Sequence, residues 1–220
     1  MKFTDFSKDY YKYKSPVSIW TLRNVYQNIA MPLTYFSYRL GITPNIVTVL
    51  SFVFFIIGAF LFYNSSYILA AICWVFSYSL DCADGALARF TNTGSRFGAF
   101  FDVSIDRIVS SMFLALICIH PESDSIVVVL GGVLLVSYSM ISSIRPLYFP
   151  ELKGYARENN SYILKLVKLP YELLDTGNML LLTCVSYYFS MQSIMMAVYS
   201  CLCLMAITYN FKIIYFKFGK

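Results

Sequence analysis

Four aspartates lie close together in a part of the chain that otherwise has the composition of membrane-embedded helix. Asp81 and Asp84 come first, and Asp102 and Asp106 follow. A carboxylate at the centre of a spanning helix costs roughly 2.5 to 3.5 kcal/mol on insertion scales, so four of them call for a bound positive charge. Because oxygen ligands suit Mg²⁺, Mn²⁺ and Ca²⁺, the sequence predicts a divalent-metal site.

The spacing of the aspartates predicts two helical stripes that face each other. Residues three and four apart share one face of a helix, so Asp81 and Asp84 line one stripe and Asp102 and Asp106 line another. A short turn between the two helices makes them antiparallel neighbours. The two carboxylate pairs can then hold one metal ion, or two at about 3.5 to 4 Å.

Small residues and one arginine accompany the aspartates. Gly85, Ala88 and Gly98 remove side-chain bulk where a ligand would approach the backbone. Arg89 offers a planar fork to phosphate oxygens, although an arginine at a helix end can also serve only as a headgroup anchor. These residues extend the predicted metal site towards a phosphate-bearing ligand.

The helices that must position these residues follow from composition. The chain of 220 residues is 58% hydrophobic and 13% charged, which predicts a single all-α integral membrane domain. A span needs about 20 apolar residues. Six are expected, at residues 44–63, 67–90, 96–119, 125–147, 173–189 and 193–216. We take residues 1–43 as a cytoplasmic N-terminal region and residues 44–220 as the six-helix catalytic domain.

The N-terminal region also contains an expected element. Residues 16–40 mix aromatic and aliphatic side chains with Arg and Gln, which predicts an interfacial amphipathic helix. Pro32 should break or kink that helix.

The basic residues predict the orientation of the spans. Lys and Arg cluster before the first span, between the second and third, between the fourth and fifth, and after the sixth. The three other connections contain none. By the positive-inside rule, both termini and the aspartates face the cytoplasm, and the net charge of +5 favours anionic lipid headgroups. Nucleic acid is not an expected partner, because no soluble basic domain exists to bind it.

The motif Asp81-x2-Asp84-Gly85-x2-Ala88-Arg89-x8-Gly98-x3-Asp102-x3-Asp106 resembles the signature of the CDP-alcohol phosphotransferases, also called CDP-alcohol phosphatidyltransferases. The six expected spans, the N-terminal interfacial helix and the Pro44-Asn45-x2-Thr48 sequence resemble that family too. The resemblance implies a membrane transferase that cleaves a CDP-linked donor to CMP and passes its substituted phosphoryl group to an alcohol. It further implies phospholipid biosynthesis, a homodimer, and a bacterial or archaeal inner or plasma membrane.

The resemblance also implies roles for individual residues. Asp81, Asp84, Asp102 and Asp106 match the ligands of Mg²⁺ or Mn²⁺, two ions being expected, and Asp106 matches the base that deprotonates the acceptor. Ser95 stands where some relatives have Thr. The positions that match contacts to the CDP part are Asn45, Thr48, Asp81, Gly85, Ala88, Arg89, Ser95 and Gly98. Asn45 and Thr48 could instead only cap the first helix.

The acceptor site is less constrained by the sequence. Ser139 places a hydroxyl on the fourth expected span, and Arg145, Lys153 and Arg157 follow it. Such a cluster can bind a phosphorylated or anionic acceptor, or can simply anchor the chain at the inner leaflet.

Several functions remain open at this level. The donor is expected to be CDP-diacylglycerol with a small alcohol as acceptor, but the same motif serves enzymes that move a small phospho-headgroup from a CDP-alcohol to a lipid or glycan hydroxyl. A membrane prenyltransferase would need more spans and two separate aspartate-rich motifs. A cation channel or transporter would need broken helices or an inverted repeat around the aspartates.

Overall fold

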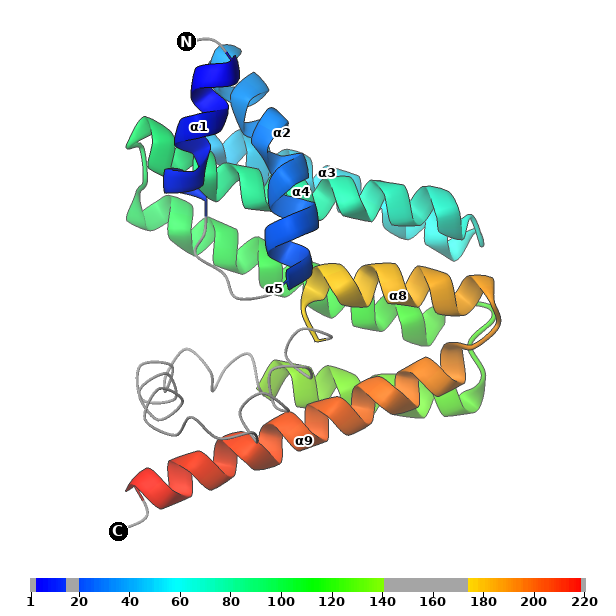
Figure 1. The fold of residues 1–220 in the computed structure, drawn as a ribbon. Helices are drawn as coiled ribbons and strands as arrows, with labels where there is room; N and C mark the ends of the chain where they lie inside the picture. Colours follow the sequence, from blue (N-terminus) through cyan, green and yellow to red (C-terminus); the bar gives the residue numbers. More distant parts are fainter. Residues whose placement is uncertain (1–2, 15–19, 141–173, 219–220) are drawn as a thin grey trace. The chain divides into compact units, whose positions relative to one another are not determined.

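The computed structural model describes residues 3–14, 20–140 and 174–218, and every regular element in these ranges is a helix (Figure 1). The chain forms two compact units. The first extends to Phe113 and includes Leu180–Val185, and the second contains Leu114–Met179 and the chain from Ser186 onwards. All four aspartates of the motif belong to the first unit.

A helix occupies each expected span. These helices are α3 (Pro44–Tyr63), α4 (Tyr67–Thr91), α5 (Arg96–Ile119), the helix Ser125–Met140, α8 (Thr176–Tyr188) and α9 (Gln192–Phe218). The fourth expected span continues to residue 147, and its last part lies outside the described residues. Among the described helices, α3 and α4 are long and apolar enough to cross a membrane by length and composition.

The start of α3 follows the sequence signal. Thr43 is extended and Pro44 occupies the first helical turn, where its missing N–H costs no hydrogen bond. Just before it, Gly41 has a φ of +68°, which a residue with a side chain rarely adopts. The chain therefore turns sharply from α2 (Gln27–Arg39) into α3.

Helices α3 and α4 form the centre of the first unit and lie side by side (Figure 1). Gly58 leaves the space for the Trp74 indole, since a Cβ at Gly58 would lie 2.5 Å from that ring. The Ser77 hydroxyl donates to the Ser51 carbonyl at 2.9 Å. Small side chains and buried hydrogen bonds thus allow the two helices to approach closely. The opposite side of α3 is apolar and exposed, at residues such as Val53, Ile57 and Phe60.

The N-terminal region is more helical than the sequence predicts. Helix α1 (Phe3–Tyr13) precedes a π-helical turn, η1 (Leu22–Tyr26), and α2. In Figure 1, α1 and α2 cross α3 and α4 steeply. The described part of residues 16–40, where an interfacial helix is expected, contains η1 and α2, whereas α1 is an element that the sequence does not predict.

Pro32 does not break the second of these helices, so the expected break is wrong, and the alternative of a kink stays a prediction. Helix α2 runs through Pro32 from Gln27 to Arg39. The residues on either side of the proline pack on α4: Ala30 is fully buried beside Ala83, and the Thr34 hydroxyl lies 3.5 Å from the Ala83 carbonyl. A proline inside a helix costs about 3 kcal/mol, and this packing against α4 offsets it.

Within the second unit, polar contacts gather at the turn before Ser125. The Ser123 hydroxyl lies 2.6 Å from the Tyr187 hydroxyl. Asp124 caps the helix Ser125–Met140 by accepting the Val127 N–H at 2.8 Å, and it also accepts a hydrogen bond from Ser193. This turn therefore connects α5, α8 and α9 through their ends.

Candidate active site

Three carboxylates of the motif converge between α4 and α5. One oxygen each of Asp81, Asp102 and Asp106 lies within 4.8 Å of the other two. Oxygens on opposite sides of a Mg²⁺ ion are about 4 Å apart, so small side-chain movements would bring these three around one ion. Asp81 and Asp102 are half-buried and Asp106 is exposed, which leaves one side of the group accessible. The donor set and its spacing fit a hard divalent cation.

Asp84, the fourth aspartate of the motif, is directed elsewhere. It is buried, and its Oδ2 accepts a short hydrogen bond from the Thr48 hydroxyl on α3. The charge of Asp84 still acts on Asp81, and that of Asp102 on Asp84. The structure therefore brings three of the four expected metal ligands into one group and places the fourth beside it, fixed by Thr48. Thr48 is therefore more than part of the first turns of α3: its hydroxyl also links α3 to Asp84 on α4.

A cavity of about 690 Å³ adjoins these carboxylates. Its volume lies in the range of small-molecule sites. Of the motif aspartates, Asp84 and Asp102 line this cavity, and Asp102 also belongs to the group of three carboxylates. Seven of the eight residues expected to contact the CDP part line its wall, namely Asn45, Thr48, Gly85, Ala88, Arg89, Ser95 and Gly98. Asp81, the eighth, does not line it.

The connection between α4 and α5 supplies another part of the wall. Residues Thr91–Ser95 line the cavity, and Asn92 adopts the left-handed conformation that ends α4. The turn before α3 contributes Gly41 and Ile42. Of these positions the sequence predicts only Ser95, because the others carry no charge, although the location of residues 91–94 between the two motif helices is a signal that they face the same ligand.

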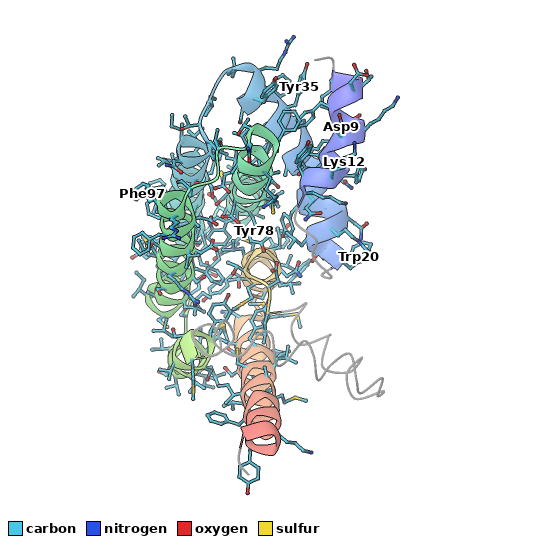
Figure 2. All side chains as sticks on the ribbon, turned by 90° about the vertical axis from the view of Figure 1, so that its left-hand side faces the viewer. Asp9, Lys12, Trp20, Tyr35, Tyr78 and Phe97 are labelled. Carbon is cyan, nitrogen blue, oxygen red and sulfur yellow. The ribbon has the colours of Figure 1, made fainter. Side chains whose placement is uncertain are left out.

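The first turn of α5 is closely packed. The Ser95 hydroxyl accepts the Gly98 N–H at 2.9 Å, so Ser95 caps this helix. A Cβ at Gly98 would lie 3.2 Å from both Ser95 Oγ and Asn45 Oδ1. Gly98 therefore leaves room for the side chains of Asn45 and Ser95, which form part of the cavity wall. Phe97, beside it, is exposed (Figure 2).

Arg89 is held in place by a helix that the sequence analysis did not include. Its Nε donates a short hydrogen bond to the carbonyl of Tyr13 at the end of α1. A Cβ at Gly85 would lie 3.3 Å from Nη1, so the guanidinium extends over Gly85. Its positive charge also acts on Asp102. Arg89 thus has specific protein contacts at the cavity and is more than a headgroup anchor.

The expected acceptor residues are not assembled by the described part of the chain. Ser139 is exposed on the helix Ser125–Met140 of the second unit. Arg145, Lys153 and Arg157 lie outside the described residues. The acceptor site therefore remains a prediction.

The chain is similar in sequence to several known proteins. The chain is 39% identical over 102 residues to the archaetidylinositol phosphate synthase of Pyrococcus horikoshii, which covers 46% of this chain and 54% of that protein. It is 36% identical over 87 residues to the phosphatidylinositol phosphate synthase of Mycobacterium tuberculosis, covering 39% and 40%. The archaetidylinositol phosphate synthase of Aeropyrum pernix matches at 35% over 119 residues, covering 53% and 61%. The chain thus matches about half the length of these relatives.

A family model gives the broader assignment. The model that describes CDP-alcohol phosphatidyltransferases matches residues 41–205, which include the cavity, the carboxylate group and most of the second unit. With three-quarters of its length matched, the chain belongs to the CDP-alcohol phosphatidyltransferase family.

Proposed function

We propose that this protein transfers a substituted phosphoryl group from a CDP-linked donor to a small alcohol and releases CMP. The observation that carries the proposal is that Asp102 belongs both to the group of three carboxylates and to the cavity wall, with Asp84 beside it in that wall. A diphosphate in the cavity would lie with its phosphates between the Arg89 guanidinium and these carboxylates. Bound Mg²⁺ or Mn²⁺, one ion or two, would neutralise the diphosphate and stabilise the charge on the departing CMP.

Each residue near these carboxylates has a task in this proposal. Arg89 offers its planar fork to phosphate oxygens. Thr48 fixes the buried carboxylate of Asp84 by donating a hydrogen bond to it. Asp106, the most exposed carboxylate of the group, accepts the proton of the acceptor hydroxyl as general base. Asp81 and Asp102 share the binding of the metal with Asp106.

We propose CDP-diacylglycerol as the donor and a phosphorylated polyol as the acceptor. Two features support this choice. The names of the relatives describe products that join a phosphatidyl or archaetidyl group to inositol phosphate. In addition, the Lys and Arg residues that follow Ser139 in the sequence have the charge that an anionic acceptor requires.

The same proposal includes a membrane location with six spans and cytoplasmic termini. The exposed apolar side of α3 supports contact with lipid, and the distribution of Lys and Arg supports the orientation. Alkaline phosphatase fused after residue 122 should be active and the same enzyme fused at the C-terminus inactive; the reverse pattern would exclude this orientation. A homodimer is proposed from the family resemblance alone.

The channel or transporter alternative has no support in the described helices. Helices α4 and α5 run without interruption through all four aspartates, whereas an ion site of that kind would require broken helices. The remaining alternative is transfer of a small phospho-headgroup from a CDP-alcohol.

The decisive experiment is a CMP-release assay on the purified full chain with Mg²⁺ or Mn²⁺. One arm combines CDP-diacylglycerol with inositol phosphate, glycerol phosphate, inositol or serine. The other combines CDP-choline or CDP-ethanolamine with diacylglycerol. Mass spectrometry of the lipid product identifies both groups. CMP should be released in the first arm with inositol phosphate; the absence of CMP with every donor would refute the proposal.

Thr48 provides a more local test. Thr48→Val keeps the shape of the side chain but removes the hydroxyl that donates to Asp84. Because a hydrogen bond to a charged group contributes about 1.5 to 3 kcal/mol, we expect kcat/KM to fall by about tenfold or more. Thr48→Ser, which restores the donor, should recover most of the activity. Equal losses in both variants would show that Thr48 acts through packing alone.

A further inference from the structure

Helix α1 docks on α4 through an uncharged face. Phe6 and Tyr10 are buried against Ala86, with Met31 and Tyr35 of α2 alongside. Burial raises the pKa of the Tyr10 hydroxyl, so this side chain stays neutral in its contact with α4. An isolated helix as short as α1 is marginal in water, so these contacts determine where it lies.

The docking is concentrated at Phe90, which is next to Arg89 in the sequence. The Phe90 ring makes edge-to-face contacts with the rings of Phe6, Tyr13 and Tyr38, with distances between ring centroids of 5.0, 5.2 and 5.0 Å. Aromatic pairs of this geometry are attractive beyond the area that they bury. Phe6 and Tyr13 therefore fix α1, and Tyr38 fixes α2, against the last turn of α4.

The end of α1 then reaches Arg89. The last carbonyl groups of a helix have no partner within the helix and form the negative end of its dipole. The Tyr13 carbonyl is one of these groups, and it accepts the hydrogen bond of Arg89 Nε. A neutral carbonyl holds the guanidinium without cancelling its charge. Nη1 and Nη2 remain directed over Gly85, at the wall of the cavity.

We propose that α1 is a positioning element of the donor site, in which the Tyr13 carbonyl and the aromatic contacts around Phe90 orient Arg89 towards the diphosphate. This inference rests on the proposed function and deepens it. A flexible arginine loses side-chain conformational entropy when the ligand orders it, and this loss weakens binding. An arginine that α1 already holds in place loses less entropy, and its guanidinium is already oriented towards the diphosphate.

The test compares four proteins: the wild type, Phe6→Ala, Arg89→Lys and the double variant. Phe6→Ala removes the ring that α1 inserts between Tyr10, Tyr35 and Phe90. We expect it to raise the KM for the CDP-linked donor about tenfold, the size of effect that one hydrogen bond to a charged group produces, with kcat and the acceptor KM little changed. In the Arg89→Lys background, Phe6→Ala should raise the donor KM no further, because Arg89 is the group through which it acts.

The dissociation constant for CDP, measured by titration calorimetry on the same four proteins, gives the second measurement and needs no turnover. It should follow the same non-additive pattern. Phe6→Leu serves as a milder variant if Phe6→Ala does not yield folded protein, and it should give a smaller rise in KM. Tyr11→Ala, on the exposed side of α1, is the matched control and should leave the donor KM unchanged. That exposed side also carries the Asp9–Lys12 ion pair (Figure 2).

The outcomes separate this inference from the proposed function. An unchanged donor KM in Phe6→Ala, or an equal rise in both backgrounds, overturns the role of α1 while CMP release by the wild type upholds the function. Conversely, a wild type that releases no CMP, with CDP affinities that follow the expected pattern, refutes the function and supports the role of α1. A rise in the acceptor KM as large as that in the donor KM would show a general structural effect.

Discussion

Asp106→Asn is expected to lower CMP release by about three orders of magnitude, within the range of about 10² to 10⁴ for the loss of a general base. The asparagine has nearly the same shape as the aspartate but cannot accept the proton of the acceptor hydroxyl. Asp106 is exposed, and asparagine still offers polar atoms to the neighbouring Asp81, so the fold should persist. The loss should fall mainly on kcat, because asparagine keeps a side-chain oxygen for the metal while it loses the proton acceptor, and the lining of the donor cavity does not include Asp106.

The matched control for this variant is Asp5→Asn, in an exposed position on α1. It should turn over like the wild type. Circular dichroism and elution from a sizing column show whether Asp106→Asn is folded. An Asp106→Asn protein that retains a third or more of the wild-type kcat would remove Asp106 from the role of base and leave it only as a carboxylate of the metal group.

Removal of divalent metal is expected to abolish CMP release completely, and Mg²⁺ or Mn²⁺ should restore it. The same ions should raise the melting temperature, because three like charges within 4.8 Å of one another repel until a cation lies between them. A ligand at about 100 times its dissociation constant adds about 2.7 kcal/mol, which corresponds to about 5 to 10 °C in a chain of this size. Thermal unfolding in EDTA and in excess metal measures this difference without any substrate.

Asp81→Asn tests whether the metal effect arises at the three carboxylates of Asp81, Asp102 and Asp106. With one like charge fewer, the variant should melt at a higher temperature than the wild type in EDTA and should lose most of the rise that metal produces. Asp9→Asn, which removes an exposed carboxylate paired with Lys12, should keep that rise. Equal melting temperatures with and without metal, together with CMP release in EDTA, would contradict the metal site.

The sequence predicts the helices of the site well because two independent signals coincide there. Thr43-Pro44 marks the start of α3, and the structure begins that helix at Pro44. The length of the apolar runs and the four-residue spacing of Asp102 and Asp106 predict α5 with the bounds that the structure has. Periodicity determines which residues share a face, and so it indicates that the carboxylates converge.

Side-chain direction is less predictable than shared faces. Asp84 lies on the expected stripe of α4, yet its carboxylate is bound to Thr48, which is 36 residues away in the sequence. Helical spacing contains no information about a partner on a third helix. Helix α1 is missed for a related reason: its propensity is modest, and its position depends on packing against Phe90 and Ala86.

The direction of the Arg89 side chain has a consequence for the size of the ligand. The guanidinium extends back over Gly85, which is four residues, or about 6 Å along the axis of α4, from Asp81. A free metal ion at the carboxylates is too small to span this interval and touch the guanidinium as well, whereas a metal-bound diphosphate can bridge it. Helix α4 therefore favours ligands of at least diphosphate length over smaller ones.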